Sequence, residues 1–136
     1  MPSIEEWNER GQGSLPGHLG VVIMVVADRL VEAQMAVRPE VMAPNGYLHA
    51  GSLVALADTC AGYGCIHHLP ENANGFTTVE LKSNHLATTR DGTLHCVARA
   101  VHLGRTTQVW DATVSHLQSG RTLMLFRCTQ MVLYPR

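Results

Sequence analysis

Hydrophobic residues occur along this chain in short runs, and glycine, proline and asparagine separate the runs. Residues 19–27 are rich in Val and Ile, and residues 29–37 alternate apolar with polar side chains, so both are predicted to be strands. Residues 4–10 predict a short helix, stopped by the Gly and Pro breakers at residues 11–17. Residues 39–46 hold two prolines and an Asn-Gly pair, which predicts a loop.

One run, residues 50–66, is long and nearly free of charge, and it is predicted to be the one long helix. Ser52 is available as its N-cap. The run is apolar on almost every side, so the helix is expected to be buried. Glycine costs about 1 kcal/mol inside a helix. The presence of Gly51, Gly62 and Gly64 therefore suggests that other backbone packs closely against it.

The second half of the chain predicts further strands separated by turns, at residues 77–86, 93–102, 106–116 and 122–133. Arg90-Asp91-Gly92 is a hairpin signal between the first two of these. One buried helix and five or six strands in meander order predict an α+β fold, in which an antiparallel sheet wraps around the helix. No linker or repeat interrupts the pattern, so residues 1–136 are expected to form a single domain.

Composition narrows the range of partners. The 136 residues are 46% hydrophobic and only 15% charged, with a net charge of −1. A charged share below the usual fraction of about a quarter suggests that another copy of the chain covers part of the surface. No basic cluster favours nucleic acid or an anionic membrane as a partner. The chain shows no signal peptide and no spanning run, so a cytoplasmic location is expected.

The four cysteines have no CxxC spacing and are expected to be small buried hydrophobes rather than a disulfide frame: Cys60, Cys65, Cys96 and Cys128. A metal site that joins the helix cysteines to His67 and His68 is conceivable, but the spacings match no zinc pattern. We therefore expect no metal.

Asp58 is the first candidate for chemistry, because it is the only charged residue on the apolar helix. Its neighbours three and four positions away cannot neutralise it: Val54, Ala55, Ala61 and Gly62. Burial of an ionised carboxylate should raise its pKa, which makes Asp58 a candidate base or nucleophile. The alternative is a structural carboxylate that meets an Arg or backbone amides from the sheet.

His49 is the second candidate, because it directly precedes the helix, where free N–H groups and the positive end of the helix dipole could stabilise an oxyanion. The alternative is a capping or packing role. Nine residues along a helix separate His49 from Asp58 by about 13 Å, so one reacting carbonyl cannot contact both in the same chain. Two helices related by a twofold axis would bring the two groups together, with the site between subunits.

These residues resemble a known signature. The stretch Asn45-Gly46-Tyr47-Leu48-His49-Ala50-Gly51, with Asp58 nine residues after the His, resembles the G-x-x-H-G-G…(Asp/Glu) pattern of hotdog thioesterases. The similarity is to the phenylacetate-degradation type and to relatives acting on 4-hydroxybenzoyl-CoA and 1,4-dihydroxy-2-naphthoyl-CoA. Residues 102–110 resemble the corresponding strand of the dihydroxynaphthoyl-CoA enzymes. The resemblance runs from about residue 19 to the C-terminus.

The resemblance implies a hotdog fold and homodimers that pair into homotetramers, with active sites at the dimer interface. It implies that Asp58 attacks the thioester or activates water, and that the Ala50 N–H holds the oxyanion. His49 would support that geometry or contact the thioester. Coenzyme A would enter as part of the substrate, and no separate cofactor is implied.

Two positions depart from the family pattern. The family usually has Gln or Asn six residues before the His, where this chain has Ala43; Asn45 could supply the amide if the loop took a changed path. Some members carry Ser or Thr four residues after the carboxylate, where this chain has Gly62. Thr78 matches the place where other members have a water-holding Ser.

The resemblance also suggests where the substrate lies. The CoA part is expected at the turn formed by His102, Gly104 and Arg105, where an Arg can reach a phosphate or simply be a solvated surface residue. The acyl part is expected near the helix and the preceding loop, at Tyr47, Gly51, Leu53, Val54 and Tyr63, each of which could equally be plain core.

The leading hypothesis is therefore hydrolysis of an acyl-CoA thioester with an aromatic or medium-sized acyl group. An enoyl-thioester hydratase of the same fold is one alternative, although its longer proline-rich signatures are missing. A non-catalytic protein that binds acyl-CoA or an aromatic ligand is the other, and Ala43 keeps it open. The sequence identifies neither the acyl group nor the choice between a covalent anhydride and general-base catalysis.

Overall fold

The computed structural model describes residues 1–136. The helical elements are α1 (Ile4–Arg10), α2 (Leu15–Leu19), the short 3₁₀ helix η1 (Pro39–Val41) and α3 (Ala50–His67). The strands are β1 (Val21–Ala27), β2 (Leu30–Ala36), β3 (Gly75–His85), β4 (Thr93–Leu103), β5 (Thr107–His116) and β6 (Thr122–Leu133). The long helix and every predicted strand are present, with ends within two residues of the prediction.

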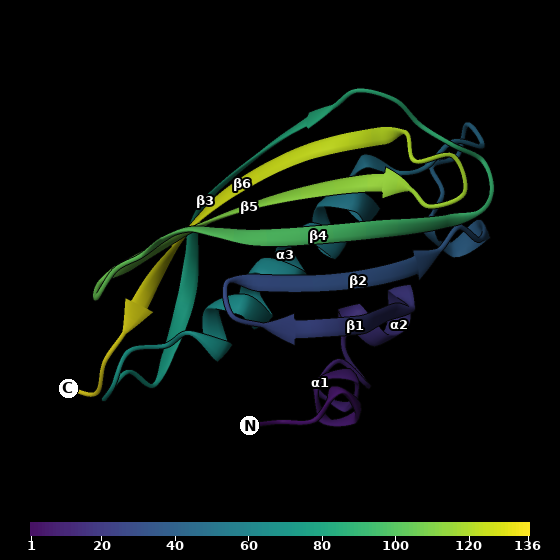
Figure 1. The fold of residues 1–136 in the computed structure, drawn as a ribbon. Coiled ribbons are helices and arrows are strands. Elements are labelled where there is room, and N and C mark those ends of the chain that lie inside the picture. The colour runs from purple at the N-terminus through teal and green to yellow at the C-terminus, as the bar shows by residue number, and fades with distance from the viewer.

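A single six-stranded sheet in the order β1-β2-β4-β5-β6-β3 curves around α3, and all its strand pairs are antiparallel (Figure 1). The predicted α+β arrangement of a sheet around one long helix is thereby confirmed. Inward-facing side chains alternate along the strands, as in β4 and β5, and they meet the helix in one core of 25 residues. All four cysteines are free and buried, as expected.

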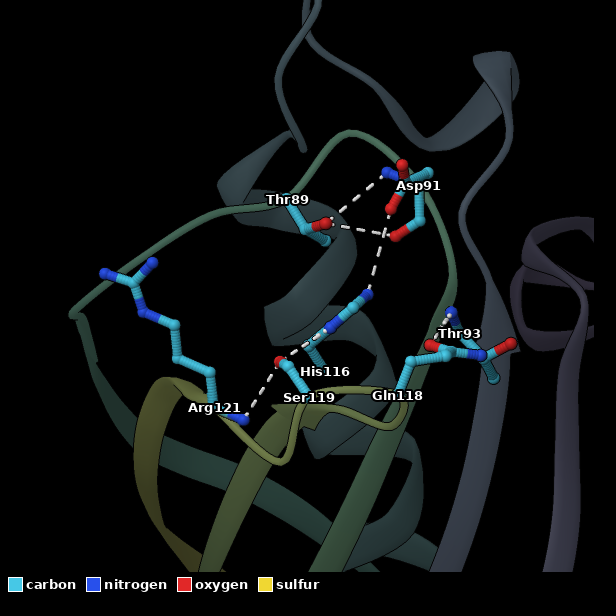
Figure 2. Close-up of polar contacts among 7 residues, drawn as sticks. All are labelled: Thr89, Asp91, Thr93, His116, Gln118, Ser119 and Arg121. Atoms are coloured by element: carbon cyan, nitrogen blue, oxygen red, sulfur yellow. Dashed lines mark hydrogen bonds and ion pairs between the residues drawn. The ribbon is translucent and has the colours of Figure 1, made fainter.

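The predicted meander is wrong at one place, the segment between β3 and β4. Arg90-Asp91-Gly92 does not make a hairpin, because β3 pairs with β6 while β4 pairs with β2. The segment instead crosses the end of the sheet, above the β5–β6 turn that carries His116 and Ser119 (Figure 2). Gly92 has a φ of +89° and lies against the His116 ring, so the chain does bend at this glycine. The bend alone does not specify which strands pair.

The N-terminal segment packs on the outer side of α3. A capping box between Ser3 and Glu6 starts α1, which buries Trp7 at 5.2 Å from the ring of Tyr63. The second helix, α2, differs from the prediction, which takes Pro16 as a residue that ends a helix. Proline is tolerated in the first turn of a helix, where the N–H it lacks would have no helical partner.

Helix α3 differs from expectation in two details. Its N-cap is His49 and not Ser52, whose hydroxyl instead donates to the Val41 carbonyl at 2.8 Å. Aromatic side chains, and not the backbone of another segment, pack against its glycines. A Cβ on Gly64 would lie 2.5–2.8 Å from the Trp110 ring, which is why this position stays without a side chain.

None of the helices has both the length and the apolar character that crossing a membrane requires.

Candidate active site

Asp58 lies at the middle of α3, and one of its carboxyl oxygens has no partner. Its Oδ1 atom is buried and has no hydrogen bond, and no ion pair includes this residue. Burial raises the pKa of the Asp58 carboxyl above its ordinary value, and the nearby Thr78 side chain opposes that rise only in part. The chain provides neither an Arg nor a backbone amide from the sheet to satisfy the carboxylate, so the structural alternative does not hold within one chain.

Thr78 lies beside this carboxyl, and Gln130 lies beside Thr78. They face each other across the β3–β6 pair, next to a bulge that follows Thr78. The Thr78 hydroxyl donates to Gln130 Oε1 at 2.6 Å, whereas Gln130 Nε2 is buried with no partner. Thr78 was named from the sequence but Gln130 was not. The only available signal was a Gln at an inward position of an otherwise apolar strand face.

The start of α3 has the opposite character, because it presents N–H groups. His49 Nδ1 accepts the Gly51 N–H at 2.8 Å, so the ring proton is on Nε2. The Ala50 N–H has no partner within the chain. Gly51 makes the cap possible, since a Cβ there would lie 2.9 Å from His49 Nδ1. A free N–H at the positive end of an 18-residue helix suits a developing negative charge.

The chain does not bring these two groups together. His49 and Asp58 stay nine residues apart on one helix, a separation of about 13 Å. Strand β3, which carries Thr78, pairs only with β6 and leaves its other side open. Val79 and Leu81 on that strand are 52% and 41% exposed.

The loop before α3 holds two more predicted residues. Asn45 Oδ1 accepts the Tyr47 N–H at 3.1 Å, and the turn is closed by the bond from the Ala43 N–H to the Tyr47 carbonyl. The Asn45 amide is thus at the exposed tip of a tight turn. The Tyr47 ring lies 4.2 Å from the Arg90 guanidinium, which comes from the crossing segment.

Two residues predicted to meet the acyl group lie in the core instead. Tyr63 is buried against Trp7, and Leu53 is only 2% exposed. Tyr63 also lies about 140° around the helix from Asp58. A cavity of about 240 Å³ opens beside His49 and Gly51 instead. Its apolar walls come from α2, η1 and α3, at Leu15, Leu19, Val41, Met42 and Ala55.

The predicted CoA contacts gather at the β4–β5 turn. The Gly104 N–H donates to the Thr107 carbonyl at 2.8 Å, and the Tyr134 hydroxyl donates to the Arg105 carbonyl. His102 folds over this turn, since a Cβ on Gly104 would lie 2.6 Å from its Nε2. The Arg105 side chain is exposed and forms no ion pair, so it is free to meet a phosphate.

The histidines and cysteines at the end of α3 are engaged elsewhere. His68 contacts the Gly64 carbonyl through Nδ1 at 2.7 Å and accepts the Arg29 N–H through Nε2 at 2.8 Å. Burial raises the pKa of the Cys65 thiol to about 12. No group of three or more His, Cys, Asp or Glu side chains is placed to hold a metal ion.

A curved antiparallel sheet wrapped around one long buried helix is the arrangement of the hotdog fold. Residues 45–127 match the model of the Thioesterase superfamily, and the chain belongs to that family. The α+β hotdog fold and the enzyme class expected from the sequence are both confirmed.

Known relatives agree with this assignment. The chain is 31% identical to the 1,4-dihydroxy-2-naphthoyl-CoA hydrolase of Escherichia coli, over 96% of this chain and 95% of that protein. It is 32% identical to the Listeria monocytogenes protein of the same name, over 82% and 89%. The crystal structure of a mutant of thioesterase PA1618 from Pseudomonas aeruginosa superposes with a TM-score of 0.92 at 32% identity, covering 98% and 95%.

Proposed function

We propose that this thioester hydrolase acts on an acyl-CoA, and that Asp58 attacks the thioester carbonyl or activates water against it. The observation that carries the proposal is the buried Oδ1 of Asp58, which has no partner on a helix that is otherwise apolar. A buried carboxylate oxygen without a partner costs stability, which favours a chemical role for Asp58. The names of the Escherichia coli and Listeria monocytogenes relatives support a CoA thioester as the substrate.

The oxyanion hole of this proposal is the Ala50 N–H of a second copy of the chain. The Ala50 donor is free but lies too far from Asp58 along the same helix. The open side of β3 supports a homodimer, because an unpaired strand edge with exposed Val79 and Leu81 can pair with its twofold mate. Pairing of such dimers into a homotetramer remains a prediction.

An aromatic or medium-sized acyl group is proposed for the substrate. The cavity of about 240 Å³ beside His49 and Gly51 is proposed to hold part of it, and a second copy of the chain would complete the walls. Arg105 and His102, exposed at the β4–β5 turn, are proposed to meet the phosphates of coenzyme A.

A second candidate is binding of an acyl-CoA without turnover. One observation favours it: Ala43 stands where the family usually has an amide, and the Asn45 oxygen is bonded within its own turn. Release of thiol separates the two candidates, since a binding protein would retain the intact thioester.

The experiment is a free-thiol release assay on a panel of acyl-CoAs with the native protein and Asp58→Asn. Loss of about two to four orders of magnitude in kcat is expected for the variant, the usual range for removing a catalytic acid or base. Asp111→Asn is the matched control, because Asp111 pairs with Arg127 on the outer face of the sheet. Full activity of Asp58→Asn would refute the mechanism, and binding without thiol release by the native protein would refute the function.

A further inference from the structure

The surroundings of Asp58 contain two buried polar atoms without partners and one hydroxyl close to both residues. The unpaired atoms are Asp58 Oδ1 and Gln130 Nε2. The hydroxyl belongs to Thr78, which bonds to Gln130 Oε1 at 2.6 Å and lies near enough to the Asp58 carboxyl to act on it. Two unpaired buried atoms on residues that share one hydroxyl are unusual, because each costs free energy.

Thr78 cannot serve both neighbours as a donor, because a hydroxyl has one proton to give. With the Gln130 amide as it stands, that proton goes to Gln130 Oε1 and the hydroxyl turns its lone pairs to Asp58. This arrangement suits a protonated Asp58, whose own O–H can donate to Thr78. It leaves an ionised Asp58 without a donor from this chain. The lowering influence of Thr78 on the Asp58 pKa requires the same proton to point to the carboxylate instead.

An ionised Asp58 requires the hydroxyl to turn towards the carboxylate. The Thr78 oxygen then presents lone pairs to Gln130, which must answer with an N–H. Rotation of the Gln130 amide by about 180° exchanges Oε1 for Nε2 in nearly the same space. After that rotation Gln130 Nε2 donates to Thr78 and Thr78 donates to the Asp58 carboxylate, while Gln130 Oε1 takes the place that Nε2 left. The carboxylate thus gains a donor, and the amide keeps its single bond to Thr78.

We propose that Gln130 is a positioning residue for Asp58, whose amide turns with the protonation state of that carboxyl and directs the Thr78 hydroxyl towards or away from it. This inference rests on the proposed role of Asp58 as the catalytic carboxylate. Gln130 is suited to the task because it is wholly buried, so no water competes for either end of its amide.

No other group near Asp58 provides the same link. From β6, the titratable side chain that interacts with it is Cys128, and burial raises the pKa of that thiol to about 12, so it stays neutral. From β3, Thr78 is uncharged, and burial and Thr78 are the two influences on the Asp58 pKa. From β5, Gln108 is bonded to the His68 carbonyl and to the Trp110 ring N–H.

The test follows the Gln130 side-chain amide in the native protein by ¹⁵N NMR across a pH titration, with its signal assigned by its absence in Gln130→Leu. The signal should move with the midpoint of the acid side of the kcat/KM profile, and Asp58→Asn should abolish that movement. A Gln130 signal that stays fixed through this midpoint, or that still moves in Asp58→Asn, would overturn the inference.

Two further variants examine the link through Thr78. Thr78→Val removes the hydroxyl and should move the acid side of the activity profile to higher pH and disconnect Gln130 from the titration, whereas Thr78→Ser should restore both. An unchanged profile in Thr78→Val would count against the inference. A different result would show that the proposed function fails: Asp58→Asn would remain fully active, whether or not the Gln130 signal follows the titration of Asp58.

Discussion

The start and the middle of α3 are opposite in their hydrogen-bonding character although nine residues of one helix separate them. At the start, N–H donors gather, His49 satisfies the one on Gly51, and the donor on Ala50 is left free. At the middle, an acceptor on Asp58 is buried with no donor. A donor without an acceptor and an acceptor without a donor are complementary, but the rigid helix keeps them apart. Each half is therefore expected to work with the other half of a second copy.

Apart from Asp58→Asn, the largest effect on activity should come from removing the free Ala50 N–H alone. Ala50→Pro deletes that N–H at the first helical position, where proline is well tolerated, and His49 before it is already extended at φ −70° and ψ 128°. We expect kcat to fall by about 10²–10³-fold, the usual cost of one oxyanion donor. Thiol-release kinetics measure the loss, and Ala50→Gly, which keeps the N–H, is the control. Native kcat in Ala50→Pro would show that this N–H is not the oxyanion donor.

Mixing the two damaged halves should restore part of the activity. In a dimer of one Asp58→Asn chain and one Ala50→Pro chain, one site has an intact donor and an intact carboxylate, while the other site has neither. With random assembly of equal amounts, about a quarter of native activity is expected. The hybrids are verified by mass spectrometry after differential labelling. No recovery in verified hybrids would mean that both groups act within one chain or that one of them does not act at all.

The unpaired oxygen of Asp58 should make the free energy of unfolding depend on pH. The pKa of Asp58 is raised in the folded state, so the folded chain binds this proton more tightly than the unfolded chain does. Stability is therefore lost as the pH rises from the ordinary Asp pKa of about 3.9 through the folded value. Asp58→Asn should be more stable than the native protein at pH 7, by less than about 1 kcal/mol because solvent reaches part of the carboxyl, and this difference should vanish below about pH 4.

Urea unfolding at pH 7 and at pH 3.5 measures this difference. A variant that is less stable than the native protein at pH 7 would mean that the Asp58 carboxylate is satisfied in solution, through a partner chain or bound water.

The smallest effect should be the change in Tm when the His49 cap at the start of α3 is lost. Gly51→Ala places a Cβ 2.9 Å from His49 Nδ1 and should push the ring away from its bond to the residue 51 N–H. Loss of an N-cap costs about 1 kcal/mol. This offsets the gain of about 1 kcal/mol that alanine otherwise brings inside a helix, so Gly51→Ala should leave Tm nearly unchanged instead of raising it. Calorimetry measures the shift. Gly75→Ala is the control, because a Cβ there meets no atom within 4 Å; equal shifts in both variants would argue against the cap.

Much of this site could be read from the sequence, because its main parts are local. Three of these parts depend on residues close together in the chain: the helix, the free N–H of its first residue and the carboxylate at its middle. The strands could be predicted from the alternation of apolar and polar side chains. The pairing of β3 with β6 could not be read, because the Arg90–Gly92 signal encodes a bend and carries no information about partners. Gln130 was missed for the same reason, since its meaning depends on Thr78, 52 residues away.

That separation of 52 residues between Thr78 and Gln130 has a consequence for the order in which the protein folds. Helix contacts form early, whereas pairing of strands far apart in the chain is slow. During refolding Asp58 should therefore be present on a formed helix while its carboxyl is still hydrated and acidic. It becomes a weaker acid only when β6 closes against β3, so recovery of the helix signal should precede recovery of a working site.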